Sequence, residues 1–204
     1  MIAFACPKCG QKFSVADHLA GRHAKCNGCG GALVIPAVAI ATSEKALPRV
    51  SVRTRRLQAD ADQVRQTFAE SEIIQVVSTR GEPPEEYEVA YNIRSLTADP
   101  EKSDDCERHQ HRVQIALTTD YPRMAPQCRM LTPIFHPNID ASTICVGDHW
   151  AAGERLVDLI VRIGEMIAYQ AYNIRSPLNA EAAMWADLNQ ASLPTDPRDV
   201  RPRE

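Results

Sequence analysis

The chain has 204 residues, which is enough for one medium-sized domain and one small domain. Its formal net charge is −3, so it lacks the strong basic excess of a general nucleic-acid-binding protein, and nucleic acid is an unlikely partner. No apolar run approaches the ~20 residues of a membrane span, and the five residues before Cys6 are too few for a signal peptide.

The first unit predicted from the sequence covers residues 1–35 and contains two Cys-x-x-Cys pairs. Cys6 and Cys9 form the first pair, and Cys26 and Cys29 follow after sixteen residues. Zinc binds four thiolates in a tetrahedron, and a glycine after each second cysteine allows the positive φ of a tight knuckle. A thioredoxin-like redox site would instead need a single pair in a βαβ setting. The spacing therefore predicts a zinc ribbon with structural Zn²⁺.

The seven cysteines as a whole form a metal-and-thiol pattern rather than a disulfide framework. We therefore expect a soluble protein of the reducing cytoplasm. Residues 36–51 read as a linker bracketed by Pro36 and Pro48. A second metal site at Cys106, His109 and His111 is disfavoured, because the spacing is irregular and no fourth ligand is evident.

Residues 52–192 read as one α+β domain. Apolar residues at helical spacing predict a helix over 53–72 that begins with three arginines. Alternating apolar residues then predict four strands of an antiparallel meander, at 73–78, 87–93, 113–117 and around 128–130, with a charged loop over 96–110. Two further helices are expected, over 154–170 and from Asn179, the second with a core face of Met184, Trp185 and Leu188. The Pro-, Asp- and Arg-rich tail, 193–204, is expected to be disordered.

Residues 136–145, with the sequence HPNIDASTIC, place a polar turn, an amide and a thiol close together. A deprotonated Cys145 thiol after a strand can attack an acyl carbon, and the Asn138 amide can donate a hydrogen bond to the oxyanion that forms. Taken alone this pattern is weak, because a cysteine between isoleucine and valine is usually a small buried hydrophobic residue.

Several motifs in the right order resemble the ubiquitin-conjugating (UBC) family. They are Tyr121–Pro126 (YPRMAP), His136–Asn138 (HPN), Ile144–Val146 (ICV), Trp150, and Ser176–Asn179 (SPLN) followed by Glu181–Ala183 (EAA). With a weaker match from about residue 57, the resemblance covers about three quarters of the chain. The short form is closer to bacterial members, and the implied fold has an N-terminal helix, the four-stranded meander and C-terminal helices.

The resemblance implies roles for four residues and for several partners. Cys145 would accept a ubiquitin-like modifier protein from an activating enzyme as a thioester and pass it to a lysine of a protein acceptor. Asn138 would stabilise the oxyanion or brace the loop, and Ser176 would orient the incoming lysine. His136 is expected to brace the turn rather than act as a general base. The family also implies that the first helix docks on the activating enzyme; a solvated basic face is the simpler interpretation of Arg53, Arg55 and Arg56.

This chain departs from the family pattern at a few positions. The spacing from Asn138 to Cys145 is one residue short, Ser176 stands where aspartate is common, and Arg123 replaces a phenylalanine of members that bind RING-type ligases. A non-catalytic binding module of the same fold therefore remains an alternative. A thiol hydrolase using Cys145 and His136 lacks a third orienting group, and a regulator built on the zinc ribbon is disfavoured by the acidic net charge.

Overall fold

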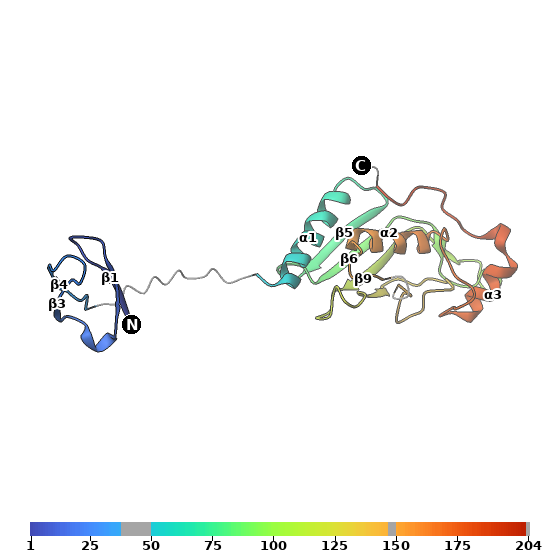
Figure 1. The fold of residues 1–204 in the computed structure, drawn as a ribbon. Coiled ribbons are helices and arrows are strands. Elements are labelled where there is room, and N and C mark those ends of the chain that lie inside the picture. The colour runs from blue at the N-terminus through green and yellow to red at the C-terminus, as the bar shows by residue number, and fades with distance from the viewer. Residues whose placement is uncertain (38–49, 147–149, 203–204) are drawn as a thin grey trace. The chain divides into compact units, whose positions relative to one another are not determined.

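The computed structural model describes residues 1–37, 50–146 and 150–202 (Figure 1). The chain divides into two compact units, an N-terminal unit, Met1–Arg49, and a C-terminal unit, Val50–Glu204. Most of the predicted linker, residues 38–49, lies outside the described residues.

The N-terminal unit consists of two short antiparallel hairpins. β1 (Ile2–Ala5) pairs with β2 (Lys12–Val15), and β3 (His23–Lys25) pairs with β4 (Ala32–Val34), with a 3-10 turn, η1 (Asp17–Leu19), between the hairpins. Its buried cluster is small: Ile2, Cys6, Cys26, Leu33 and Ile35. Chains of about 40 residues or fewer usually need a disulfide, a metal or a partner, because so few apolar side chains cannot offset the entropy of folding.

The C-terminal unit begins with α1 (Val52–Thr67). Ser51 caps the helix, because its hydroxyl accepts a hydrogen bond from the Thr54 N–H at 2.9 Å. The helix ends five residues earlier than the sequence pattern predicts. A turn forms there instead, in which the Ser71 hydroxyl accepts from the Ile74 N–H at 3.0 Å and leads the chain into the sheet.

A four-stranded antiparallel sheet follows, as the alternating pattern predicts. Its strands are β5 (Ile74–Arg80), β6 (Glu86–Tyr91), β9 (His111–Ala116) and β10 (Gln127–Met130), in the spatial order β10-β9-β6-β5. Val89 lies opposite Val113 on the buried face, whereas Glu88 and Arg112 form an ion pair on the other face. The predicted charged loop contains a small extra ladder of β7 (Ser95–Leu96) and β8 (Glu107–Arg108).

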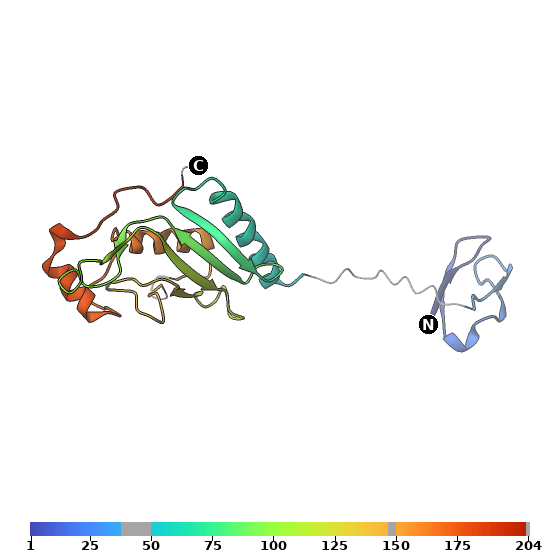
Figure 2. The same cartoon turned by 180° about the vertical axis from the view of Figure 1, so that it is seen from behind.

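The helix α2 (Leu156–Ile167) packs on the apolar face of this sheet (Figures 1 and 2). Nine of its twelve residues are buried, and the Tyr91 hydroxyl of β6 donates to the Ile160 carbonyl at 3.0 Å. Residues of α1 and α2 and the inward-facing strand residues form one core cluster. This core lies under the segment that carries Cys145, because Ile144 and Val146 belong to it.

The last helix, α3 (Ala180–Leu188), is capped by Asn179, whose side chain accepts from the Ala182 N–H at 3.0 Å. A short 3-10 turn, η3 (Gln190–Ser192), follows it. The predicted core face of α3 is wrong at two of its three positions, because Met184 is 63% exposed and Leu188 is 76% exposed. The helix instead buries Ala182, Ala183, Trp185 and Ala186, and the small side chains allow it to pack closely.

The tail also differs from its prediction, because residues 193–202 pack on the C-terminal unit. Val200 is 3% exposed and belongs to the main core cluster. A methyl group built on Gly164 of α2 would lie only 2.5 Å from Val200 Cγ1, so the missing side chain of Gly164 makes room for the tail. The Gln170 side chain donates to the Asp196 and Arg198 carbonyls. Composition alone cannot reveal these partners, and residues 203–204 lie outside the described residues.

Candidate active site and metal centre

The four paired cysteines come together in the N-terminal unit. All four Sγ atoms lie within 4.8 Å of one another, and among the described residues they are the only group of three or more potential ligands at such distances. Two equivalent knuckles present them. The Gly10 N–H donates to the Cys6 carbonyl at 2.9 Å and the Gly30 N–H to the Cys26 carbonyl at 2.8 Å, with φ of +75° and +69° at the two glycines.

The sulfur separations fit a tetrahedral zinc ion. Two of them are 3.8 Å for Cys6–Cys29 and 3.6 Å for Cys9–Cys26. Four sulfurs placed 2.3 Å from a central zinc are separated by about 3.8 Å. The donor set, four thiolates with no oxygen ligand, also suits Zn²⁺ better than a hard cation.

In the C-terminal unit, the 136–145 segment folds back on itself and presents Cys145. Isolated bridges join His136 to Ile139 and Ile139 to Ile144, and the Cys145 N–H donates to the Asn138 carbonyl at 3.0 Å. The Ile144 N–H also donates to the Cys128 carbonyl of β10 at 2.9 Å. The cysteine is therefore held beside the edge strand β10, next to the asparagine backbone, with its side chain half-buried.

A cavity of about 180 Å³ lies beside Cys145 and brings three predicted site residues together. Its lining residues are Asn138, Cys145, Arg162, Met166, Ala171, Tyr172, Asn173 and Ser176. Asn138 and Cys145 come from the folded segment, and Ser176 comes from the loop that follows α2. His136 is not among the lining residues.

The Asn138 side chain is buried and connects this segment to the 173–176 loop. Its Nδ2 donates to the Asn173 carbonyl at 2.7 Å and, more weakly, to the Ser176 carbonyl at 3.5 Å. Its Oδ1 accepts from the Asn173 N–H at 2.6 Å. Both ends of the amide therefore hold the loop that carries Ser176.

His136 is fully buried behind the turn. Its Nδ1 accepts from the Asn138 N–H at 3.1 Å, and its ring packs edge-on against Tyr169, with 4.8 Å between ring centroids. Burial lowers the pKa of His136 to about 3, because an imidazolium would lose its hydration there. The ring is therefore neutral at pH 7, and the nitrogen that could accept a proton already accepts a hydrogen bond.

The arginines at the N-terminal end of α1 mostly form contacts within the C-terminal unit. Arg53 pairs with Glu85 at 2.6 Å, and Arg56 donates to the carbonyls of Ala152 and Glu154 in the segment before α2. Of the three arginines that the sequence singled out there, Arg55 is the one that is exposed. A run of charges in sequence cannot distinguish a solvated face from such internal pairs.

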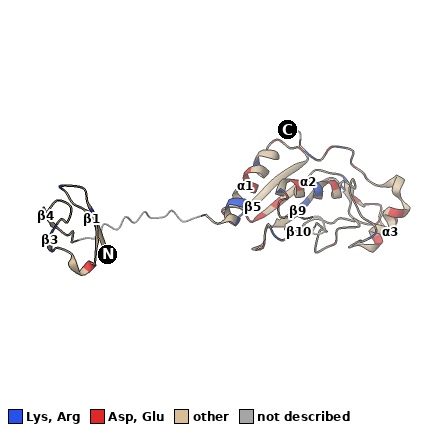
Figure 3. Cartoon of the chain, in the orientation of Figure 1, with Lys and Arg blue, Asp and Glu red and all other residues tan. Residues whose placement is uncertain are grey.

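Arg162 and Tyr172 are cavity residues that sequence reasoning missed. Arg162 is the only cation in α2, whose other charged residues are Asp158 and Glu165. Figure 3 shows where charged residues lie on this mostly buried helix. This isolated cation was the available signal, since a charge within a mostly buried helix needs a local reason. Tyr172 lies in the loop after α2 and carried no pattern that could have identified it.

The comparisons with known proteins identify the family of this chain. A family model described as "Ubiquitin-conjugating enzyme" matches residues 85–194, more than half of the chain. Ubiquitin-conjugating enzyme E2 N of Drosophila melanogaster is 29% identical over 92 residues, which cover 43% of this chain and 60% of that protein. The SUMO-conjugating enzyme UBC9 of Caenorhabditis elegans is 28% identical over 78 residues, covering 35% and 46%. The chain thus spans about half the length of these curated relatives.

Solved structures share the fold. A Plasmodium yoelii structure described as a candidate ubiquitin conjugating enzyme aligns with a TM-score of 0.51 and 20% identity, over 69% of this chain and 87% of that chain. A structure described as a novel ubiquitin-conjugating enzyme aligns with a TM-score of 0.52 and 20% identity, over 71% and 94%. In the described residues, no helix is long and apolar enough to cross a membrane. Because the family model covers more than half of its length, this chain belongs to the ubiquitin-conjugating enzyme family.

Proposed function

We propose that this chain is a conjugating enzyme that carries a ubiquitin-like modifier as a thioester on Cys145 and transfers it to a lysine of a protein acceptor. The observation that carries the proposal is the shared cavity of Cys145, Asn138 and Ser176 in a chain of this family. An activating enzyme, the modifier and the acceptor are the partners. We further propose a bacterial-type member that acts in the cytoplasm, consistent with its short form and reduced cysteines.

The proposed reaction has two steps. The Cys145 thiolate attacks the carbonyl carbon of the thioester that joins the modifier to the activating enzyme. A new S–C bond forms, the bond to the activating enzyme's sulfur breaks, and that sulfur takes up a proton equivalent to the one Cys145 lost. A neutral lysine amine then attacks the same carbon and gives up a proton, and the Cys145 sulfur leaves.

Ser176 and Asn138 support this reaction in different ways. The Ser176 hydroxyl can orient the incoming amine by hydrogen bonding, although it cannot attract a proton as a carboxylate would. For Asn138, the contacts to Asn173 favour bracing of the loop. One Nδ2 hydrogen is held only weakly, by the Ser176 carbonyl at 3.5 Å, so it can turn to an oxyanion during the reaction.

The four cysteines of the N-terminal unit are proposed to hold a structural zinc ion. Their separations and their all-sulfur chemistry support this assignment. The ion would supply the bonds that stabilise the two hairpins, and no step of the transfer involves it.

Intact-mass spectrometry tests the carrier role. The protein is mixed with ATP, a candidate activating enzyme and its modifier. Wild type should gain an adduct that thiol reductant removes, Cys145→Ala should gain none, and Cys145→Ser should give an adduct that survives reductant. Cys106→Ser is the matched control, because Cys106 is also half-buried but does not line the cavity. Absence of an adduct from every cognate pair, with the protein folded, would favour the non-catalytic binding module.

Replacing Asn138 separates its two proposed roles. Asn138→Ala should slow transfer to lysine by about 10²-fold if the amide stabilises the oxyanion. If the amide instead braces the loop, hydrogen exchange of residues 171–176 should also become faster, because two hydrogen bonds to Asn173 are lost. Asn92→Ala, which removes a similar amide-to-carbonyl bond to Glu72 elsewhere, should leave the transfer rate unchanged. An unchanged transfer rate in Asn138→Ala would contradict the oxyanion role, and unchanged hydrogen exchange of residues 171–176 would contradict the bracing role.

A further inference from the structure

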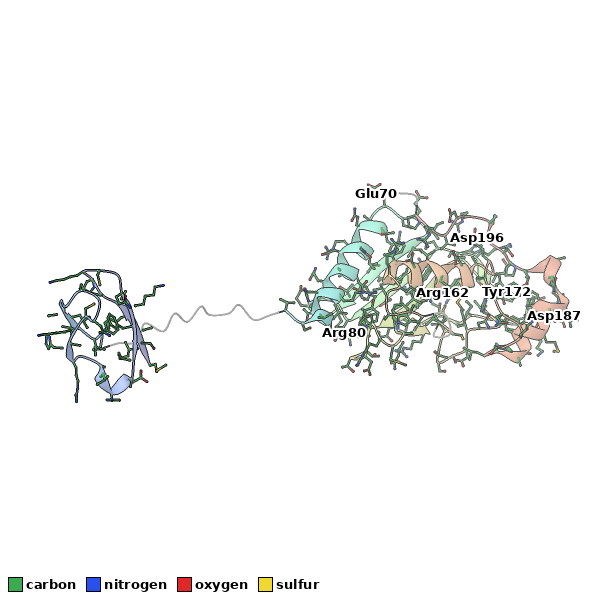
Figure 4. All side chains as sticks on the ribbon, in the orientation of Figure 1. Glu70, Arg80, Arg162, Tyr172, Asp187 and Asp196 are labelled. Atoms are coloured by element: carbon green, nitrogen blue, oxygen red, sulfur yellow. The ribbon has the colours of Figure 1, made fainter. Side chains whose placement is uncertain are left out.

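The cavity beside Cys145 contains an arginine that the proposed reaction does not yet use. Arg162 projects from the middle of α2 (Figure 4). It lines the cavity together with Cys145 and Tyr172. Its side chain is 24% exposed. Arg162 and Cys145 line the same cavity of about 180 Å³. A charge on the wall of so small a cavity can change the pKa of another group on that wall.

The charge of Arg162 is only partly compensated. Its Nη1 lies 2.8 Å from Glu154 Oε1, which is the one ion pair that the described residues give it. Nε and Nη2 are buried and have no hydrogen-bond partner among the described residues. Leaving buried donors of a charged group unpaired costs free energy, about 1–3 kcal/mol for each neutral group and more for a charged one. Such a cost suggests that this charge serves a function beyond packing.

The described residues that line the cavity contain no negative charge to oppose that of Arg162. Among the eight lining residues Arg162 is the only cation, and none of them is a carboxylic acid. The neighbouring thiol of Cys128 is neutral at pH 7, because burial raises its pKa to about 12. Arg175, next to Ser176, is exposed to solvent. Glu154 is therefore the main described group that offsets Arg162.

We propose that Arg162 supplies the positive charge that stabilises the Cys145 thiolate, and that Glu154 moderates it. A cation that lines the same cavity favours the anionic form of a thiol through its electric field. The same charge disfavours an ammonium ion in the cavity, so an incoming lysine is favoured as the neutral amine that can attack the thioester. This second consequence rests on the proposed function, whereas the effect on the thiol does not.

The experiment measures the alkylation rate of Cys145 by iodoacetamide as a function of pH, using the full chain and peptide mass spectrometry. Arg162→Met should raise the apparent pKa of Cys145 by about one unit and slow alkylation about tenfold at pH values below that pKa. Arg162→Lys should keep most of the wild-type rate, because it keeps the charge. Glu154→Gln should shift the profile in the opposite direction, to lower pH.

Two controls separate charge from structure. Arg80→Gln removes a cation that is 83% exposed on β5 and should leave the profile of Cys145 unchanged. Within each sample, the alkylation rate of Cys106 is an internal reference that should not follow the Arg162 and Glu154 substitutions. If Arg162→Met does not fold, Glu154→Gln still tests the proposal. The proposal would be overturned if the pH profile of Cys145 were unchanged in both Glu154→Gln and Arg162→Met when both variants fold. If Arg162→Met does not fold, an unchanged profile in Glu154→Gln alone would overturn the proposal.

The alkylation experiment needs no modifier, so its outcome is independent of the carrier role. Shifted profiles in a protein that accepts no modifier would support the role of Arg162 and argue against the transferase. A thioester adduct on wild type, with profiles that do not respond to either substitution, would support the transferase and eliminate Arg162 as the source of charge.

Discussion

In the N-terminal unit the buried cluster of the described residues holds five side chains, two of them cysteines, whereas the main cluster of the C-terminal unit holds 27 residues. The first cluster is too small to offset the chain entropy of its hairpins, and the second is large enough to do so without a bound ion. From this difference we expect the proposed metal ion to stabilise the first unit, whereas a packed core holds the segment that carries Cys145. The two units should therefore respond to different perturbations.

The largest expected effect is that of metal removal on the N-terminal unit. A chelator, or Cys9→Ser, should abolish its fold, since apparent binding free energies of structural zinc are about 10–16 kcal/mol. The amide resonances of residues 1–37 should collapse to the narrow dispersion of an unfolded chain. Trp150 and Trp185 both lie in the C-terminal unit, so the thermal transition followed by tryptophan fluorescence should stay unchanged. Hairpin resonances that survive removal of the metal would contradict the expectation that the N-terminal unit needs a bound metal to fold.

Acid should destabilise the C-terminal unit through two buried histidines. Burial lowers the pKa of His136 to about 3 and that of His111 to about 4, below the value of about 6.5 expected when unfolded. The unfolded state therefore binds more protons between pH 6.5 and 3, and stability falls as pH falls through this window. Between pH 8 and pH 5, the two histidines together should lower the free energy of unfolding by about 4 kcal/mol.

Denaturant unfolding followed by tryptophan fluorescence measures this pH dependence. His136→Gln should remove about half of it, because the substitution removes one of the two titrating groups. His109→Gln, which replaces an exposed histidine, is the control and should keep the wild-type slope. A stability of His136→Gln that falls with acid as steeply as that of wild type would show that His136 is not buried in the neutral form.

Asp60→Ala should destabilise the C-terminal unit by about 2–3 kcal/mol. Asp60 is 3% exposed, pairs with Arg56 at 2.7 Å and accepts from the Tyr121 hydroxyl at 2.5 Å, so its removal leaves the Arg56 Nε and the Tyr121 hydroxyl without their acceptor. The partial exposure of Arg56 keeps the effect below that of a fully buried pair. Asp62→Ala, on the same helix but 56% exposed, should change stability by less than about 0.5 kcal/mol. Equal losses in the two variants, measured by urea unfolding, would argue against a buried network.

Val200→Ala is expected to have the smallest effect, about 1.5 kcal/mol for two buried methyl groups. Val50→Ala, at a position that is 58% exposed, should have almost none. Urea unfolding monitored by tryptophan fluorescence distinguishes the two. A neutral Val200→Ala would mean that the tail is disordered, as its composition suggests, and that the core of the C-terminal unit ends before it.

The candidate site was predictable where chemistry is local in sequence. The two cysteine pairs needed only their spacing, and the segment from His136 to Cys145 combined its turn, amide and thiol within ten residues. The four strands were predictable as well, because the alternation of apolar and polar residues along a strand indicates which of its faces is buried. Ser176 is more distant, and only the family resemblance connected it with Cys145.

Other features depended on contacts between segments that lie far apart in the chain. Arg162 joins the site because α2 crosses the sheet at an angle that brings its one cation to the cavity, and helical periodicity does not encode that angle. Asn138 holds the 173–176 loop because that loop returns to it after α2. The tail is ordered because Gly164 leaves space for Val200.

The sequence by itself therefore determined which four cysteines cluster and the order and type of most elements, because spacing and periodicity express local bonding directly. Together with the family resemblance, it also predicted which thiol is the candidate nucleophile. Only the tertiary structure decided which side chains share the cavity with that thiol, which charges around it are compensated and how the tail packs. Those properties depend on distances between segments remote in sequence, and such distances are set by how the helices and the sheet pack together.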